Sequence, residues 1–397
     1  MPHDNTQLLD YFVRHQDEIA GWRHDMHRHP ELAFNERWTS DFIAARLESF
    51  GYEVVRGLGG TGVVATLAGP GTAAIGLRAD MDALPMEERN TFDHRSQHAG
   101  CMHACGHDGH SAMLLAAARY LSTQHDLPGT VHFVFQPAEE GEGGADAMVR
   151  DGLFERFPMS AIYGLHNWPG LEEGTIAARV GTQMAAFDVF EIFLRGQGAH
   201  GAMPHQGQDC LVAASELTLQ LQTIVSRSID PLDTAVVSVT QMHGGDAWNV
   251  LPAEVVLRGS TRHLKADVQD RIETRMRELC AGVAQSFGIA VELKYRRRYP
   301  ATVNSAAETG VALRAAGRTV GAANTFDNRP PSMASEDFGF MLQSRPGCYV
   351  WLGAGDSSGG RTLHSPVYDF NDRLLGIGAA YWVNLAYEGL AAANSPP

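Results

Sequence analysis

The chain has 397 residues, of which 44% are hydrophobic and 19% charged, a composition typical of a globular protein that can hold two domains. Its net charge of −15 argues against a nucleic-acid partner, because phosphate binding needs a basic surface, and the one dense basic run, Arg296–Arg298, is read as a solvated strand end. Five cysteines without a dense pattern fit a reducing compartment, and the sequence contains neither a signal-peptide pattern nor an apolar run of about 20 residues. We therefore expect a cytoplasmic protein without a membrane partner.

The first half of the chain alternates helices with short apolar strands. Amphipathic helices are predicted at residues 7–28 and 36–50, and the histidines between them, His27 and His29, are read as structural because Pro30 turns the chain. Strands and further helices are then predicted, in chain order, at residues 62–67, 74–78, 111–122 (helix), 130–135, 145–150 (helix) and 161–165. This alternation predicts an α/β fold with a mostly parallel sheet covered by helices on both faces.

Polar side chains follow these strands where each one ends, namely Asp80 and Asp82, then Glu139 and Glu140, then His166. Ligands bind beyond the carboxyl ends of the strands in such sheets, so we expect these side chains to converge. Adjacent glutamates cannot point the same way from an extended backbone, so one can ligate a metal while the other faces a bound water as general base. A lone pair of glutamates is usually a solvated turn, but the place of this pair at a strand end favours a function.

The densest set of metal-binding residue types lies between Cys101 and His110 and reads Cys-Met-His-Ala-Cys-Gly-His-Asp-Gly-His. A disulfide or scattered buried histidines are the alternative, which the density of polar groups disfavours. Thiolate, imidazole and carboxylate ligands suit zinc, manganese, cobalt or nickel better than calcium or magnesium. Two metals would need a bridging ligand, and Cys101 as a thiolate or an aspartate could supply it.

The pattern changes near residue 184. Strands at 187–195, 234–242, 253–262 and 290–296 and helices at 209–226 and 266–287 follow the β-α-β-β-α-β order of a ferredoxin-like unit. The α/β pattern then resumes with a helix near 306–321, a strand at 348–352 and a C-terminal helix at 371–390. We predict a catalytic domain formed by residues 1–184 and 296–397, with an inserted α+β lid domain over residues 185–295.

Five successive motifs resemble those of the aminoacylase/carboxypeptidase family of dinuclear metallohydrolases, in the branch of bacterial hippurate hydrolases and plant auxin-conjugate amidohydrolases. The motifs are Leu77–Pro85, Cys101–His110, Gln136–Gly141, Gly164–His166 and Leu363–Ser365. The resemblance implies two divalent metal ions per subunit, with Glu139 as the catalytic base and Asp82 as a carboxylate that orients a ligand. The metal ligands that it implies are Cys101 (bridging), His103, Glu140, His166 and His364. We assign His107, Asp108 and His110 to hydrogen bonds around the site and to helix capping, and Cys105 to a structural role.

The lid carries three further candidates. His200 resembles the histidine that, in dimeric relatives, reaches the partner's active site to stabilise the oxyanion, although it could be a surface loop residue. Asn249 resembles an asparagine that contacts substrate. Arg262 is a candidate for the substrate's carboxylate, which a guanidinium binds through two hydrogen bonds, although strand-end arginines are often only solvated. The resemblance thus implies a homodimer through the lid.

These observations predict metal-dependent hydrolysis of the amide bond of small N-acyl amino acids, hippurate-like or N-acetylated, to a carboxylic acid and a free amino acid. A dipeptidase or carboxypeptidase uses the same chemistry and stays open. A non-enzymatic metal or redox sensor using Cys101 and Cys105 is the third possibility, and it would leave Glu139 and His364 without a role.

Overall fold

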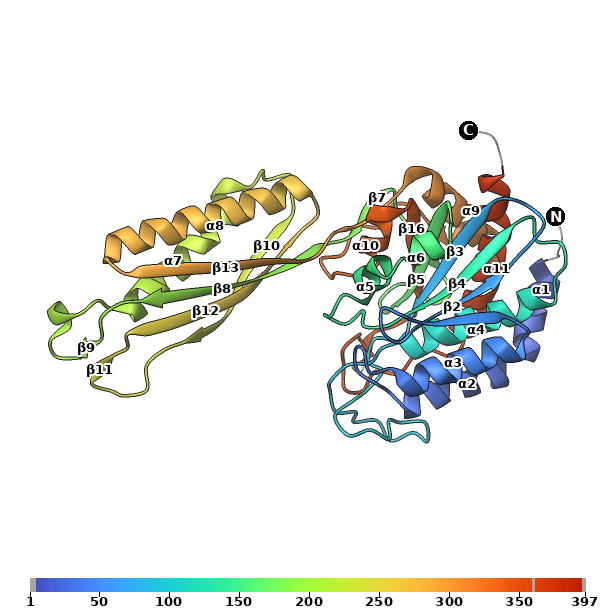
Figure 1. The fold of residues 1–397 in the computed structure, drawn as a ribbon, viewed down its shortest axis with the longest axis horizontal. Helices are drawn as coiled ribbons and strands as arrows, with labels where there is room; N and C mark the ends of the chain where they lie inside the picture. Colours follow the sequence, from blue (N-terminus) through green and yellow to red (C-terminus); the bar gives the residue numbers. More distant parts are fainter. Residues whose placement is uncertain (1–4, 359–360, 395–397) are drawn as a thin grey trace. The chain divides into compact units, whose positions relative to one another are not determined.

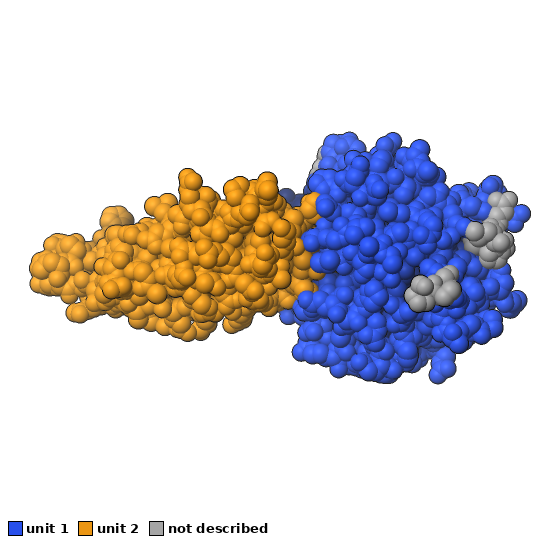
Figure 2. Space-filling view, turned by 90° about the horizontal axis from the view of Figure 1, so that it is seen from above, with its two compact units in different colours: residues 1–183, 302–330, 337–397 blue, residues 184–301, 331–336 orange. Residues whose placement is uncertain are grey.

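The computed structural model describes residues 5–358 and 361–394, and the chain divides into two compact units (Figure 2). Unit 1 comprises residues 1–183, 302–330 and 337–397, and unit 2 comprises residues 184–301 and 331–336. Residues 1–4, 359–360 and 395–397 lie outside the described part. Among the described residues, no helix combines the length and the apolar character needed to cross a bilayer.

Unit 1 is built on an eight-stranded sheet with the strand order β1-β2-β4-β3-β5-β16-β6-β15 (Figure 1). The central strands β4, β3, β5 and β16 are parallel, and β1, β2 and β6 add antiparallel pairs at the two sides. The strands are β1 (Glu53–Leu58), β2 (Gly62–Leu67), β3 (Ala74–Asp80), β4 (Thr130–Gln136), β5 (Ala161–Trp168), β6 (Ile176–Ala177), β15 (Thr325–Phe326) and β16 (Gly347–Gly353). A separate two-stranded sheet pairs β7 (Gly181–Met184) with β14 (Thr302–Asn304).

Helices cover both faces of this sheet (Figure 1). The long helices pack side by side, with α4 at their centre, which is apolar and buried over nearly its whole length. They are α1 (Asn5–Arg14), α2 (Gln16–Arg28), α3 (Arg37–Ser49), α4 (His107–Ser122), α9 (Ala306–Val320) and α11 (Leu374–Ala393). The shorter helices α5 (Gly144–Arg150), α6 (Leu153–Arg156) and α10 (Gly339–Ser344) pack together, with α5 in contact with both others and with β4. The α/β class with a mostly parallel sheet, predicted from the alternation of elements, is confirmed.

Unit 2 is a four-stranded antiparallel sheet in the order β10-β12-β8-β13, with two helices packed on one of its faces. Its elements are β8 (Ala186–Arg195), β9 (Ala199–His200), α7 (Cys210–Thr223), β10 (Ala235–His243), β11 (Val250–Leu251), β12 (Glu254–His263), α8 (Ala266–Phe287) and β13 (Ala290–Tyr299). Along β8 every second residue is buried, and Phe190, Ile192 and Leu194 join the core under α7 and α8. The period of two leaves the other face of the sheet without a covering helix in this unit.

Three boundaries differ from those expected. The helix predicted at residues 7–28 is broken at His15 into α1 and α2. Unit 2 continues to residue 301 rather than 295, because β13 runs to Tyr299 before the chain re-enters unit 1. Helix α4 begins at His107, four residues before the predicted start, so His107, Asp108 and His110 belong to its first turn. This last difference changes the reading of the site.

Candidate metal centre

The start of α4 is determined by Gly106, whose backbone is left-handed with φ of 94°. A Cβ at this position would lie 2.6 Å from Oδ1 of Asn167 and 2.9 Å from the Tyr368 hydroxyl, so only glycine fits. The close approach brings the helix N-terminus against the end of β5, where His166 and Asn167 lie. Cys105 and His107, on either side of Gly106, are therefore directed to the carboxyl edge of the parallel strands.

Six side chains converge at this edge. The Cys105 thiol lies 3.3 Å from Nε2 of His166. Ligand atoms lie within 4.8 Å of one another in three overlapping groups, which are Cys105, His107 and His166, then Cys105, Glu140 and His364, then His107, Glu139 and Glu140. One carboxylate oxygen is central, since Oε1 of Glu140 lies 3.2 Å from Nε2 of His364 and 4.0 Å from Nε2 of His107.

The atoms of this cluster fit a metal centre. Nε2 of His107 and Oε1 of Glu140 are buried without a hydrogen-bond partner, a costly arrangement unless another group binds them. Thiol, imidazole and carboxylate form a donor set that suits zinc or another first-row transition metal. Any two of the three groups have one residue in common, which is Cys105, His107 or Glu140. Such an arrangement can hold two ions close together with shared ligands.

Asp82 forms hydrogen bonds that orient two residues of the cluster, His107 and Glu140. The Nδ1–H of His107 donates to the backbone carbonyl of Asp82 at 2.9 Å and lies 3.2 Å from its carboxylate, so Nε2 faces the cluster. The other carboxylate oxygen of Asp82 accepts the backbone N–H of Glu140 at 2.9 Å. The predicted role of Asp82, to orient a ligand, is consistent with this position.

Charge is concentrated around these ligands. Burial alone would lower the pKa of His107, but Asp80 and Asp82 raise it to about 10. Asp80, although fully buried, has its pKa held well below the usual range by His107, His110 and Arg78. Burial, together with Glu140, raises the pKa of the Cys105 thiol, and burial lowers that of His166. These shifts describe the protein alone, and a cation in the cluster would favour the thiolate.

The turn after β4 directs Glu139 and Glu140 into the cluster. Glu139 is buried, and one of its carboxylate oxygens accepts the backbone N–H of Asp337 at 3.3 Å. His364 comes from the loop after β16, where its backbone has a positive φ of 61° and its N–H donates to the carbonyl of Ala104 at 2.8 Å. The loop is thereby tied to the residue next to Cys105.

Cys101 and His103, which the resemblance implies as ligands, lie outside the cluster, so the candidate ligand set of the structure differs from the predicted one. Neither belongs to any group of three or more candidate ligand atoms among the described residues. Both ring nitrogens of His103 are buried without a partner, and burial lowers its pKa to about 4, but its ring neighbours His27 at 6.2 Å rather than further ligands. Cys105 was predicted to be structural and His107 to form hydrogen bonds. In the structure these two residues lie among the candidate ligands, where Cys101 and His103 were expected.

A model of the peptidase family M20/M25/M40 matches residues 76–388. The chain belongs to this family. It is 40% identical over 384 residues to the hippurate hydrolase of Campylobacter jejuni, covering 96% of this chain and 99% of the relative. It is 36% identical over 381 residues to the N-acetyl-L-cysteine deacetylase of Bacillus subtilis, covering 96% of this chain and 89% of the relative. The resemblance inferred from the motifs is confirmed, and the chain is a hydrolase.

A solved structure shares the whole M20 architecture. The Bacillus subtilis YXEP protein, described as a dinuclear metal-binding peptidase of the M20 family, is 32% identical with a TM-score of 0.84, covering 96% of this chain and 99% of that one. The description of that protein as dinuclear agrees with the three overlapping ligand groups.

The three predicted lid residues all lie in unit 2 of this M20 protein. His200 is exposed on β9, and its neighbour across the small β9–β11 sheet is Val250. Asn249 is also exposed, and its carbonyl accepts the N–H of Gly201 at 2.7 Å, so Asn249 and His200 are adjacent. Arg262 lies apart on β12, half-buried, with its guanidinium 4.1 Å above the ring of Phe187 and donating to the Ser335 hydroxyl at 2.6 Å.

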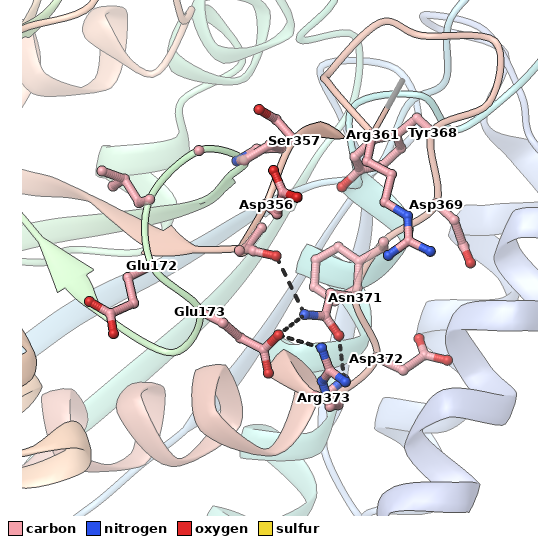
Figure 3. Close-up of a pocket in the computed structure, with 16 residues that line it drawn as sticks. Glu172, Glu173, Asp356, Ser357, Arg361, Tyr368, Asp369, Asn371, Asp372 and Arg373 are labelled. Atoms are coloured by element: carbon pink, nitrogen blue, oxygen red, sulfur yellow. Dashed lines mark hydrogen bonds and ion pairs between the residues drawn. The ribbon is translucent and has the colours of Figure 1, made fainter. Parts of the chain in front are cut away.

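A pocket of about 940 Å³ adjoins the ligand-bearing strands of unit 1 (Figure 3). Its walls are the loop after β5 and the loop after β16, the loop that also carries His364. In the view of Figure 3, Asn371 and Arg373 converge on the carboxylate of Glu173, at 2.9 and 2.5 Å, and so tie the two loops together. The Tyr368 hydroxyl in its wall accepts a hydrogen bond from Asn167, the neighbour of His166, at 2.6 Å. None of the six clustered side chains lines the pocket, so it lies beside the candidate metal centre.

Proposed function

We propose that this M20 hydrolase cleaves the amide bond of N-acyl amino acids with two divalent ions, Mn²⁺, Zn²⁺, Co²⁺ or Ni²⁺, which Cys105, His107, Glu140, His166 and His364 would hold. The observation that carries the proposal is the convergence of these five residues, with two buried ligand atoms, Nε2 of His107 and Oε1 of Glu140, that have no hydrogen-bond partner. Relatives named as a hippurate hydrolase and an N-acetylcysteine deacetylase support this substrate class.

Glu139 would act as the general base and acid. The metal ions, when bound, supply an activated water and polarise the amide carbonyl. Glu139 lies among the ligand atoms without being needed as a ligand, and from there its carboxylate can take the proton of the attacking water. It would then pass that proton to the departing amine, which leaves as the free amino acid.

We propose roles for the lid residues on the same basis. His200 would stabilise the oxyanion in the partner subunit of a homodimer, Asn249 would contact the substrate, and Arg262 would bind its carboxylate. Arg262 suits that role because it is half-buried, lines a pocket of about 500 Å³, and pairs with no carboxylate in unit 2. A monomer in light scattering that keeps full activity would remove His200 from the mechanism.

Exposed apolar side chains on α7 and around the edge strand β10 support a dimer through the lid. An unpaired edge strand is a site where a second chain can add. These side chains are Val212, Leu219, Leu232 and Val236. All five cysteines are free and buried, which favours a reducing compartment such as the cytoplasm.

The test is hydrolysis of hippurate, N-acetyl amino acids and dipeptides by protein stripped with a chelator and refilled with each metal. Activity on acyl amino acids that is lost on stripping and returns with one metal would support the proposal and identify a working ion. Dipeptides as the sole substrates would favour the peptidase alternative. Full activity in a Glu139→Gln variant would contradict the assigned base and revive the sensor alternative.

A further inference from the structure

A buried carboxylate outside the metal centre supports the turn that carries Glu139 and Glu140. Glu36 immediately precedes α3 and is fully buried, yet its side chain does not cap that helix. One of its oxygens accepts the hydroxyl of Thr61 at 2.6 Å, and the other accepts the backbone N–H of Ala138 at 2.8 Å. A carboxylate buried this deeply is costly unless its hydrogen bonds serve the fold or the site.

Ala138 has an uncommon backbone conformation. Its φ is 53°, in the left-handed region, where a residue with a Cβ is disfavoured. Its carbonyl accepts the N–H of Gly144 at 2.9 Å, so both the N–H and the C=O of Ala138 are hydrogen-bonded. Because Glu139 and Glu140 follow directly, the direction of both side chains depends on this one residue.

We infer that Glu36 is a positioning residue that holds Ala138 in its left-handed conformation, from which Glu139 and Glu140 both reach the metal centre. The inference rests on the roles proposed above for those two glutamates. The turn has two other supports, since Asp82 accepts the N–H of Glu140 and the N–H of Asp337 donates to Glu139. Of these three side chains, Glu36 is the one that hydrogen-bonds to Ala138 itself, the residue with the disfavoured φ.

A neighbouring glutamate provides the matched control. Glu31, five residues earlier, accepts the backbone N–H groups of Trp38 and Thr39 at 3.1 and 2.9 Å, and also the hydroxyl of Thr39 at 3.1 Å. Its side chain therefore stabilises the first turn of α3 and does not reach the turn after β4. Replacing Glu31 costs helix stability, whereas replacing Glu36 alters the geometry of the site.

Glutamine is the conservative replacement for Glu36. Burial raises the pKa of Glu36 to about 7, so the neutral acid, which an amide resembles, is accessible near neutrality. A glutamine keeps one carbonyl oxygen for the N–H of Ala138, and its amide can donate to the Thr61 hydroxyl. Alanine removes both acceptors.

The experiment compares kcat and KM of the full-length enzyme and its Glu36→Ala, Glu36→Gln and Glu31→Ala variants at saturating metal. We expect Glu36→Ala to lower kcat on the order of 10–100-fold with KM nearly unchanged, because a small misplacement of a catalytic group has effects of that size. Glu36→Gln should keep kcat within about threefold of wild type, and Glu31→Ala should lower the melting temperature without this loss of kcat.

A double variant tests the conformational cause. Glycine adopts a positive φ without penalty, so Glu36→Ala combined with Ala138→Gly should recover at least about threefold of the lost kcat. Recovery would support the inference. No recovery, or a loss of kcat in Glu31→Ala equal to that in Glu36→Ala, would overturn it.

If Glu36→Ala does not fold, Glu36→Gln and Glu36→Asp take its place. Aspartate keeps the charge but is one methylene too short to reach Ala138, so only the glutamine should retain kcat, and equal losses in both would overturn the inference. Failure of the proposed function is a separate outcome, because the metal-loaded wild type would then hydrolyse no acyl amino acid.

Discussion

Two Cys-x-His pairs lie four residues apart in this chain, Cys101 with His103 and Cys105 with His107, and in the described part of the chain only the second lies among further candidate ligands. All four side chains are nearly fully buried. The first pair flanks Met102, which is extended and exchanges backbone hydrogen bonds with Leu84 at 3.0 and 3.1 Å. The second pair flanks a left-handed glycine at the start of a helix.

The comparison shows that ligand spacing identifies candidates but does not choose between them. Residues i and i+2 of an extended segment share a face, so either pair could in principle present a thiolate and an imidazole together. The two pairs differ in their surroundings, because His166 at the end of β5 and Glu140 and His364 from two loops lie near the second pair, whereas no such group forms around the first pair among the described residues. The choice is made by the turn at Gly106 and by the strand ends it approaches.

The largest test of this comparison is the pair of variants Cys105→Ser and Cys101→Ser. Loss of a direct ligand should exceed the roughly 10–100-fold loss of metal affinity that follows removal of an outer partner, so Cys105→Ser should lose at least about 100-fold in hippurate hydrolysis. Cys101→Ser should stay close to wild type. Mass-spectrometric metal content and the thiolate-to-metal absorption of the cobalt-loaded proteins measure the same difference directly. The opposite result would restore Cys101 as the bridge.

Two buried carboxylates offer a second, smaller test. Asp82 forms hydrogen bonds with His107 and Glu140. Asp108 instead accepts hydrogen bonds from His27 at 2.8 Å and from Arg23 at 3.2 Å, and His27 is the ring neighbour of His103 in the first pair. Asp82→Asn should therefore weaken metal binding about 10–100-fold in competition with a coloured chelator. Asp108→Asn should lower the melting temperature while metal affinity stays within about threefold. Equal losses of affinity in both variants would contradict the separation of the two pairs.

Much of the site could be predicted from the order of elements along the chain. Asp82, Glu139 and Glu140 follow parallel strands and His166 lies near the end of one, and the carboxyl ends of such strands meet at one edge of the sheet. His364 was predicted from its motif alone, and its place in the cluster follows the same logic, since it comes from the loop after β16.

The choice of Cys105 and His107 could not be predicted in the same way. The apolar period indicated a helix from residue 111, because the polar first turn of α4 does not look helical, and that placed His107 in a loop. The turn before His107 depends on tertiary structure, because Asn167 and Tyr368, from distant segments, lie close to Gly106. Gly106 was the available signal, since a glycine just before a helix marks a special turn. The role of Glu36 could not be predicted from the sequence either, because a lone glutamate at a helix start usually remains in solvent.

The smallest effect is a pH dependence that reports on the surroundings of the first pair. His27 is fully buried, with Nδ1 2.8 Å from Asp108 and Nε2 3.2 Å from Glu88. Burial alone would lower its pKa, but the two carboxylates raise it to about 9. A histidine with a raised pKa stabilises the folded state fully below its ordinary pKa, and this contribution is lost as pH rises through the raised value.

The difference in free energy of unfolding between wild type and His27→Gln should therefore contain a part of about 3 kcal/mol that is present at pH 6 and lost above pH 9. Urea unfolding at several pH values measures it, and a difference that is flat with pH would contradict the raised pKa. The same titration with metal bound sharpens the comparison of the two pairs. A cation on His103, whose ring lies 6.2 Å from that of His27, would repel the protonated His27 and move the loss to lower pH. A cation held by Cys105 and His107 would not be bound to His103, the ring neighbour of His27, so we expect the loss to occur at the same pH with metal and without it.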